Sequence, residues 1–172
     1  EMREGEYAAA EELLRDNMER AARLGHTSYY VLALGNLGNC LHWQGRHLEE
    51  LELRREYVTR ARKTGDVANL IFAVGNLGSA WMRLGDAEKA IPSFQEAVDL
   101  SVKQGILRSQ AIYGASLGEA IVASGGSDLE PLKKALVAAD GGADLYSKVL
   151  TRCVAARCYF RVQEPEKARR YF

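Results

Sequence analysis

Three series of glycines recur through this chain at one interval of 40 residues. The series are Gly25, Gly65 and Gly105; Gly38, Gly78 and Gly118; and Gly45, Gly85 and Gly125. Apolar residues keep the same register at Leu37, Leu77 and Leu117, and again at Leu41, Trp81 and Ile121. Self-similarity at a fixed period of this length indicates a repeat protein, in which each unit packs on its neighbours in the chain.

The positions of the glycines predict two helices in every unit. The series that begins at Gly25 follows basic residues at the end of amphipathic runs, as left-handed C-caps do. The series that begins at Gly45 marks the tight turn between the two helices of a unit, and in the third unit Ser127 and Glu130 have capping-box spacing after that turn. The series that begins at Gly38 lies inside the first helix, where glycine costs about 1 kcal/mol relative to alanine. Close approach of a neighbouring helix is the expected compensation.

Composition supports a helical chain and limits the classes of partner. The 172 residues are 47% hydrophobic and include only 3 prolines, and no segment alternates polar and apolar residues as a half-buried strand does. Basic and acidic residues number 23 each, so we expect no general nucleic-acid partner and no acidic-membrane partner. No apolar run approaches the length of a membrane span, and the first residues lack the architecture of a signal peptide.

The three cysteines favour a reducing, cytoplasmic location. Cys40, Cys153 and Cys158 are odd in number and show no metal-type pairing. A free cysteine behaves mostly as a small buried apolar residue.

The segment GNLGSAWMRLGDAEKAIPSFQEAV, residues 75–98, resembles the tetratricopeptide repeat. The matching residues are Leu77, Gly78, Trp81, Gly85, Ala90, Phe94 and Ala97. The resemblance implies an all-α fold, a right-handed superhelical solenoid of antiparallel helix hairpins with about four units. Glu50 and Arg54 depart from the pattern, because the motif has alanine and an aromatic residue there, and Pro92 removes a backbone donor inside a second helix.

The register predicts a single repeat domain over residues 1–172, divided into whole and partial units. We expect the second helix of a partial unit at 5–25, whole units at 26–65, 66–105 and 106–143, and a partial unit at 144–172. Because the chain begins and ends in half-units without polar caps, we interpret it as an excerpt of a longer protein.

Catalytic and metal-binding patterns are weak in this sequence. His26 and His47 follow turn glycines, and we interpret both as exposed polar residues. Cys153 and Cys158 fall on different faces of one helix, so a zinc site is not expected. The string GNLGN lacks the Lys and Ser/Thr of a phosphate loop and follows no predicted strand. We therefore expect no enzymatic activity, no cofactor and no metal.

A stack of helical hairpins presents a concave surface, built from the first helix of every unit, that suits an extended peptide or a helix. With the mid-helix glycine as register, the predicted groove residues are Asn36, Asn39, His42, Trp43, Phe72, Asn76, Ser79, Met82, Arg83, Ile112, Ser116 and Glu119, together with Leu32. An asparagine side chain both donates and accepts, so it suits a peptide backbone. A solvated helix face explains Asn36 and Asn76 about equally well, and Trp43 fits the core as well as the groove.

Tetratricopeptide proteins of the co-chaperone type clamp a terminal carboxylate with two asparagines and three cations. Asn39 and Asn76 match the two amides, but Gly35, Ile112 and Ser116 occupy the cation positions, so this clamp is not expected. The long unit is similar to those of spindle-orientation adaptors and kinesin light chain, and to sensor domains of bacterial signal-transduction ATPases.

Three hypotheses about function follow. The first hypothesis is a non-catalytic adaptor that binds a protein or peptide segment in its groove. The alternative is a ligand-sensing regulatory domain of a larger signalling or transcription-regulating ATPase, which an enclosed apolar cavity near Trp43, Phe72 and Ile112 would favour. A third hypothesis is a scaffold that self-associates through exposed solenoid ends.

Overall fold

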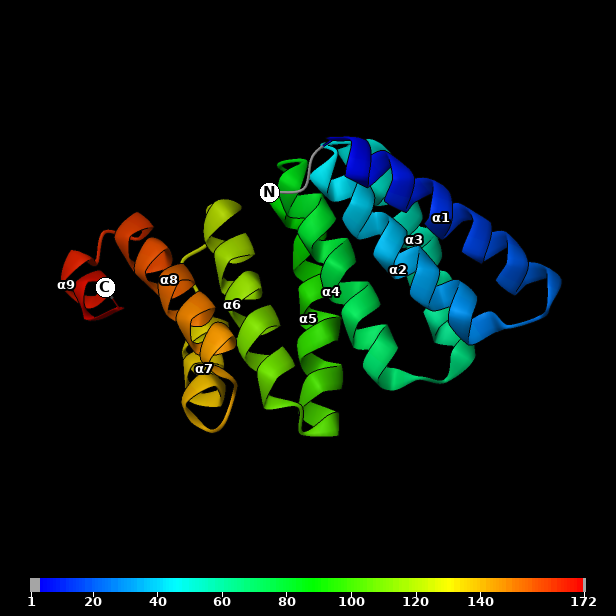
Figure 1. The fold of residues 1–172 in the computed structure, drawn as a ribbon. Coiled ribbons are helices and arrows are strands. Elements are labelled where there is room, and N and C mark those ends of the chain that lie inside the picture. The colour runs from blue at the N-terminus through cyan, green and yellow to red at the C-terminus, as the bar shows by residue number, and fades with distance from the viewer. Residues whose placement is uncertain (1–3, 172) are drawn as a thin grey trace. The chain divides into compact units, whose positions relative to one another are not determined.

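The computed structural model describes residues 4–171, and within that range the chain consists of helices and turns without a strand (Figure 1). The helices are α1 (Glu4–Arg23), α2 (Thr27–Trp43), α3 (His47–Thr64), α4 (Val67–Arg83), α5 (Ala87–Gln104), α6 (Leu107–Ala123), α7 (Glu130–Asp140), α8 (Leu145–Arg161) and α9 (Pro165–Ala168), followed by the 3-10 turn η1 (Arg169–Tyr171). The all-α prediction is confirmed. Across the described residues, no helix is both long and apolar enough to span a membrane.

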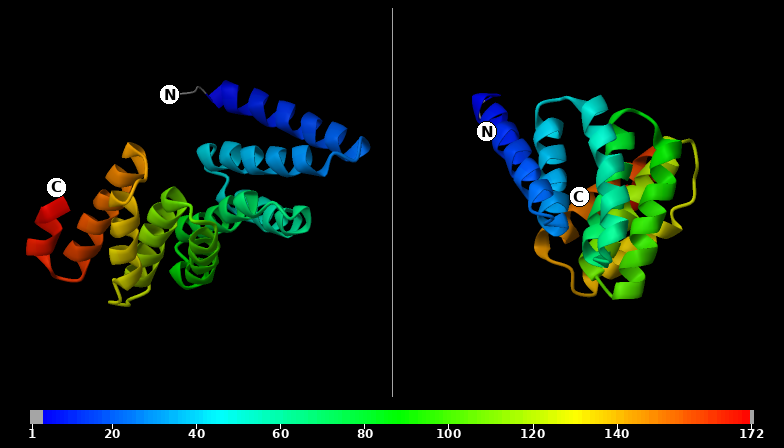
Figure 2. Two further views of the ribbon diagram at one scale, coloured as in Figure 1. Left: turned by 90° about the horizontal axis from the view of Figure 1, so that it is seen from below. Right: turned by 90° about the vertical axis from the view of Figure 1, so that its right-hand side faces the viewer.

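The chain forms two compact units, which meet in sequence between Leu84 and Gly85. In the first unit α1 packs against α2, α2 against α3, and α3 against α4. Figure 2 shows the long α1, in blue, beside α2. The core side of α2 carries Leu34, Leu37 and Leu41, all buried, at the helical spacing of one face. These leucines form the buried face of α2.

The second unit is arranged around α6, which packs against α5, α7 and α8, while α9 packs against α8. Gly118 and Gly114 lie where α6 approaches α7: a Cβ on either glycine would lie 2.9 Å from the Cβ of Leu132 or Ala135. The close approach expected at Gly118 is therefore confirmed. Pro92 lies inside α5, which nevertheless continues from Ala87 to Gln104.

The turn glycines adopt the left-handed conformation that their register predicts. The φ values are 70° at Gly25, 73° at Gly45, 71° at Gly65, 79° at Gly85, 68° at Gly105 and 90° at Gly125. No heavy atom lies within 4 Å of a Cβ built on any of these six residues, so backbone conformation and not space requires glycine.

The predicted capping box at Ser127 and Glu130 is wrong. The helix α7 starts at Glu130 with Leu129 at the cap position, so Ser127 lies outside the cap and Glu130 is too early in the helix for this motif. The Oδ1 atom of Asp128 instead accepts a hydrogen bond of 2.9 Å from the backbone N–H of Glu130.

Candidate functional site

All twelve residues of the predicted groove are exposed or partly exposed. Nine of them, from Asn36 to Arg83, lie on α2 and α4 in the first unit, and Ile112, Ser116 and Glu119 lie on α6 in the second. Trp43 is 66% exposed and Phe72 is 48% exposed, which places both side chains at the surface. Of the two interpretations left open for Trp43, the core one is therefore wrong, although exposure alone does not make a binding groove.

The three asparagines of this set differ in their surroundings. Asn36 is exposed and Asn76 is half-buried, and neither side chain forms a hydrogen bond within the described part of the chain. The Oδ1 atom of Asn39, in contrast, accepts a hydrogen bond of 2.7 Å from Nη2 of Arg54. The amides of Asn36 and Asn76 are therefore without a partner within the described residues, whereas that of Asn39 holds Arg54 of α3.

Several other polar residues of the set are engaged within the protein. The hydroxyls of Ser79 and Ser116 donate to carbonyls one turn earlier in their own helices, Gly75 at 3.1 Å and Ile112 at 3.0 Å. In the second unit Glu119 on α6 accepts a hydrogen bond of 2.9 Å from Nη2 of Arg157 on α8. The polarity available to a partner is therefore smaller than the sequence indicates.

Glu50 and Arg54, the two departures from the repeat motif, form a buried ion pair one helical turn apart on α3. Glu50 is 0% exposed and Arg54 is 2% exposed, and Nη2 of Arg54 lies 3.4 Å from Oε1 of Glu50. Nη1 of Arg54 also donates to the carbonyl of Gly35 at 2.9 Å. Burial lowers the pKa of the Arg54 guanidinium, and the negative charge of Glu50 opposes that effect.

The guanidinium of Arg54 also explains the mid-helix glycine of the first unit. A Cβ on Gly38 would lie 2.6 Å from Cζ of Arg54. The neighbour that Gly38 accommodates is therefore an arginine side chain and not a helix backbone. In the sequence, Glu50 and Arg54 stand out only as departures from the repeat motif. Their opposite charges, one helical turn apart, are nevertheless a signal for an ion pair.

Glu50 connects the end of α4 to the same cluster. Nε of Arg83 donates to Oε2 of Glu50 at 3.2 Å, and Nη2 of Arg83 donates to Oε1. Arg83 was predicted to face the groove, and its side chain is tied to a buried carboxylate while it remains 26% exposed. The ends of α2 and α4 and the start of α3 therefore meet at one charged centre.

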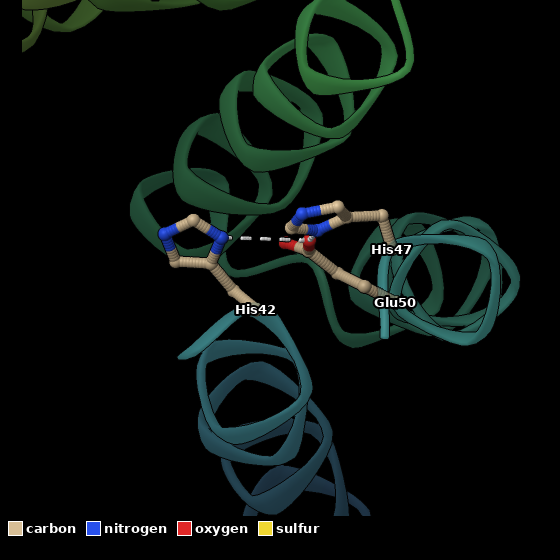
Figure 3. Close-up of side chains that lie close together, drawn as sticks. All are labelled: His42, His47 and Glu50. Carbon is tan, nitrogen blue, oxygen red and sulfur yellow. Dashed lines mark ion pairs between the residues drawn. The ribbon is translucent and has the colours of Figure 1, made fainter. Parts of the chain in front are cut away.

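Two histidines complete this centre, as Figure 3 shows. Nδ1 of His42 lies 3.8 Å and Nδ1 of His47 lies 3.6 Å from Oε2 of Glu50. The interpretation of His47 as an exposed residue is wrong, because His47 is partly buried and its Nδ1 atom lies inward against Glu50. His26 is exposed, as predicted. Burial lowers the pKa of the His42 imidazole, and the positive charge of Arg83 acts in the same direction.

Surface hollows of moderate size lie in both compact units of the chain. One of about 420 Å³ lies between α1 and α2 and is lined in part by Leu14, Leu24, Tyr29, Leu32 and Asn36. Another of about 540 Å³ lies in the second unit against α5, α6 and α7, and its charged lining is mixed: Asp99, Lys103, Asp128, Glu130 and Lys134. The first hollow adjoins two of the predicted groove residues.

The cysteines form no pair, and all three are free. Cys40 and Cys158 are buried, whereas Cys153 is exposed. Burial raises the pKa of the Cys158 thiol to about 11. Such a thiol stays protonated near neutral pH and is a poor nucleophile or metal ligand.

The chain matches no family model and no curated protein. Solved structures, however, share its fold. A crystal structure from Podosopora anserina, described as kinesin light chain nearly identical TPR-like repeats, aligns with a TM-score of 0.75 and 19% identity over 97% of this chain and 84% of that one. BtubC from P. vanneervenii aligns with a TM-score of 0.55 and 16% identity, over 96% of this chain and 87% of BtubC.

A third similar structure is the MamA RS-1 ArsTM double mutant, with a TM-score of 0.58 and 14% identity over 95% of this chain and 90% of that chain. Structural similarity at sequence identities of 14–19% establishes the fold of this chain and not its activity. The chain therefore has an all-α, TPR-like helical repeat fold, as the 40-residue register predicts.

Proposed function

We propose that this chain is a non-catalytic interaction module that binds a protein or peptide segment on the exposed faces of α2 and α4, the first helices of two of its repeats. TPR-like repeats serve in general as scaffolds for protein partners, and extended helical repeats provide long surfaces for such contacts. The proposal is carried by one repeated arrangement on α2 and α4.

On each of these helices an exposed apolar side chain is followed one turn later by an amide. Leu32 is 52% exposed and precedes Asn36 on α2, and Phe72 is 48% exposed and precedes Asn76 on α4. Residues four apart lie on the same face of a helix. Apolar contact with hydrogen bonds from unengaged amides is what recognition of a peptide segment requires.

The exposure of the aromatic residues favours a protein segment over a small ligand. Small-molecule sites enclose most of the ligand surface in a largely apolar pocket. Trp43 and Phe72 are 66% and 48% exposed, so both side chains lie at the surface, and Trp43 borders a hollow of about 350 Å³ beside α1. An open surface of this kind fits the adaptor hypothesis better than the sensor hypothesis.

The proposal is tested by photo-crosslinking in cells of the source organism. A photoreactive phenylalanine analogue replaces Phe72 in one variant and Val102, which is 59% exposed on α5, in a matched control. We expect one protein to crosslink at position 72 and not at position 102. Crosslinks that are the same at both positions would contradict a site on the first helices.

A second measurement uses the purified partner. The double variant Asn36→Ala with Asn76→Ala is expected to bind the partner at least tenfold more weakly, whereas Gln104→Ala, an exposed amide at the end of α5, binds it normally. Asn39→Ala is unsuitable for this purpose because Asn39 holds Arg54. Unchanged affinity in the double variant would place the binding site elsewhere.

A further inference from the structure

The end of α2 and the start of α3 bring two histidines and a carboxylate together. His42, His47 and Glu50 each offer one ligand atom, and these three atoms all lie within 4.8 Å of one another (Figure 3). Figure 3 shows His42 reaching across from α2 to the Glu50 carboxylate, with the ring of His47 beside it on α3. The helical hairpin thus brings together three potential metal ligands, of which only His42 belongs to the predicted groove.

The Nδ1 atoms of both histidines are buried and have no hydrogen-bond partner among the described residues. A buried polar atom without a partner is costly, and such atoms are rare in native proteins. Both unpaired atoms lie near the same carboxylate oxygen, so a single ligand between them would satisfy both.

The separations fit a shared ion better than direct hydrogen bonds. Nδ1 of His42 and Nδ1 of His47 lie 3.8 and 3.6 Å from Oε2 of Glu50, which is too long for hydrogen bonding. Two ligands bound to one zinc ion at about 2.0–2.2 Å in a tetrahedral arrangement lie about 3.4 Å apart. Each histidine therefore needs to move by only a few tenths of an ångström relative to the carboxylate.

The two oxygens of Glu50 face different groups. Oε1 accepts a hydrogen bond from Nη2 of Arg83 and lies 3.4 Å from Nη2 of Arg54. Oε2 faces the histidines, with Nε of Arg83 at 3.2 Å. The carboxylate can therefore keep the Nη2 contacts of Arg83 and Arg54 through Oε1, while Oε2 exchanges the Nε contact of Arg83 for an ion. The nearby guanidinium groups repel a cation, so we expect a site of moderate affinity.

We propose that His42, His47 and Glu50 bind a divalent transition-metal ion of the zinc type. Imidazole nitrogens with a carboxylate oxygen suit zinc and its neighbours, whereas calcium and magnesium prefer oxygen ligands alone. Three protein ligands leave a further position for water or an external ligand. The ion would join the last turn of α2 to the first turn of α3, and the site does not depend on the proposed interaction function.

The test is a calorimetric titration of untagged, metal-free protein with Zn²⁺. The parent protein carries Cys153→Ser, because Cys153 is the exposed thiol among the three cysteines. The test variants are His42→Ala and His47→Ala, and the matched control is His26→Ala, since His26 is an exposed histidine outside the cluster. We expect one ion per chain in the parent and the control, and at least tenfold weaker binding in both test variants.

Thermal unfolding provides a second readout, because an ion that binds only the folded state raises the melting temperature. Zinc should raise the melting temperature of the parent and of His26→Ala, but not of His42→Ala or His47→Ala. His47→Gln keeps a polar side chain at the turn and replaces His47→Ala if the alanine variant does not fold. Absence of binding by the parent, or equal binding by the parent and the folded cluster variants, would overturn the proposal.

Discussion

The guanidinium of Arg54 lies in the space that a Cβ on Gly38 would occupy, with Cζ only 2.6 Å from that position. Gly38 is on α2 and Arg54 on α3, so one pair of residues sets how the two helices of this hairpin meet. In this unit Arg54 replaces the aromatic residue of the motif. Its guanidinium fills the space beside position 38, so this position still requires glycine.

Gly38→Ala should destabilise the protein because the added methyl group collides with a side chain that is itself held by hydrogen bonds. Overpacking of this kind costs about 1–3 kcal/mol, and removal of a helical glycine returns about 1 kcal/mol. We expect a net loss of about 1 kcal/mol in the free energy of unfolding, measured by chemical denaturation. In an Arg54→Leu background the same substitution should cost nothing, and an identical cost in both backgrounds would show that Arg54 is not the cause.

Arg54→Leu alone should be severely destabilising, because it leaves the buried carboxylate of Glu50 with less compensation. Removal of one partner of a buried ion pair costs about 3–5 kcal/mol, whereas replacement of both partners by apolar groups is often neutral. The combination Glu50→Ala with Arg54→Phe installs the residues that the next unit has at Ala90 and Phe94.

We expect this double variant to be close to the wild type in denaturation midpoint and more stable than Arg54→Leu. If the double variant is as unstable as the single variant, the ion pair has no apolar substitute in this fold and the repeat motif is not interchangeable between the units.

Gly118→Leu should strongly destabilise the second unit, because its Cβ alone would already lie 2.9 Å from the Cβ of Leu132. Overpacking between α6 and α7 should cost about 3 kcal/mol, which lowers the melting temperature of a chain of this size by about 6–12 °C. The matched control is Ala123→Leu, since Ala123 is exposed at the end of the same helix. Equal melting temperatures in the two variants would refute close packing at Gly118.

Asp144 at the start of α8 should give stability that depends on pH. Its carboxylate accepts a hydrogen bond of 3.1 Å from the backbone N–H of Ser147, and this bond, followed by the Ser147 hydroxyl, lowers the pKa of Asp144 in the folded protein. A carboxylate with a lowered pKa stabilises the fold above its unfolded pKa of about 3.9 and loses that effect as the pH falls through the folded value.

Asp144→Ala should therefore be less stable than the wild type at pH values near neutrality, and the difference should narrow as the pH falls toward about 3. Denaturation curves at several pH values provide the measurement, with Asp99→Ala as a control because Asp99 is an exposed residue inside α5. A difference that stays constant with pH would contradict the role of the ionised carboxylate as an N-cap.

The fold was predictable because its signals are local and repeated. The turn glycines need a left-handed backbone wherever they occur, and the six of them do adopt it. The apolar spacing of Leu34, Leu37 and Leu41 indicates the buried face of a helix without reference to any other helix. The cap before α7 was mispredicted because the helix starts at Glu130, and a short shift in the start of a helix moves every capping position with it.

The candidate groove was only partly predictable from the register. The register places Leu32, Asn36, Phe72 and Asn76 at the surface, and the structure leaves all four at least partly exposed. The register does not show that Asn39 and Arg83 are held by other side chains. Exposure follows from the position of a residue on its own helix, whereas engagement depends on which side chain reaches it from another helix. The full set of residues that line the groove therefore stays a prediction.

The amino-acid sequence by itself determined the repeat period, the helical hairpins and the left-handed turns, because each depends on residues close together along the chain. Only the tertiary structure decided which groups surround the Glu50 carboxylate. They are His42 on α2, Arg54 on α3 and Arg83 on α4. A periodic pattern treats a charged residue at a core position as a defect. Three helices that converge on the same carboxylate turn it into a centre of ion pairs, because burial without partners would cost more than the fold could offset.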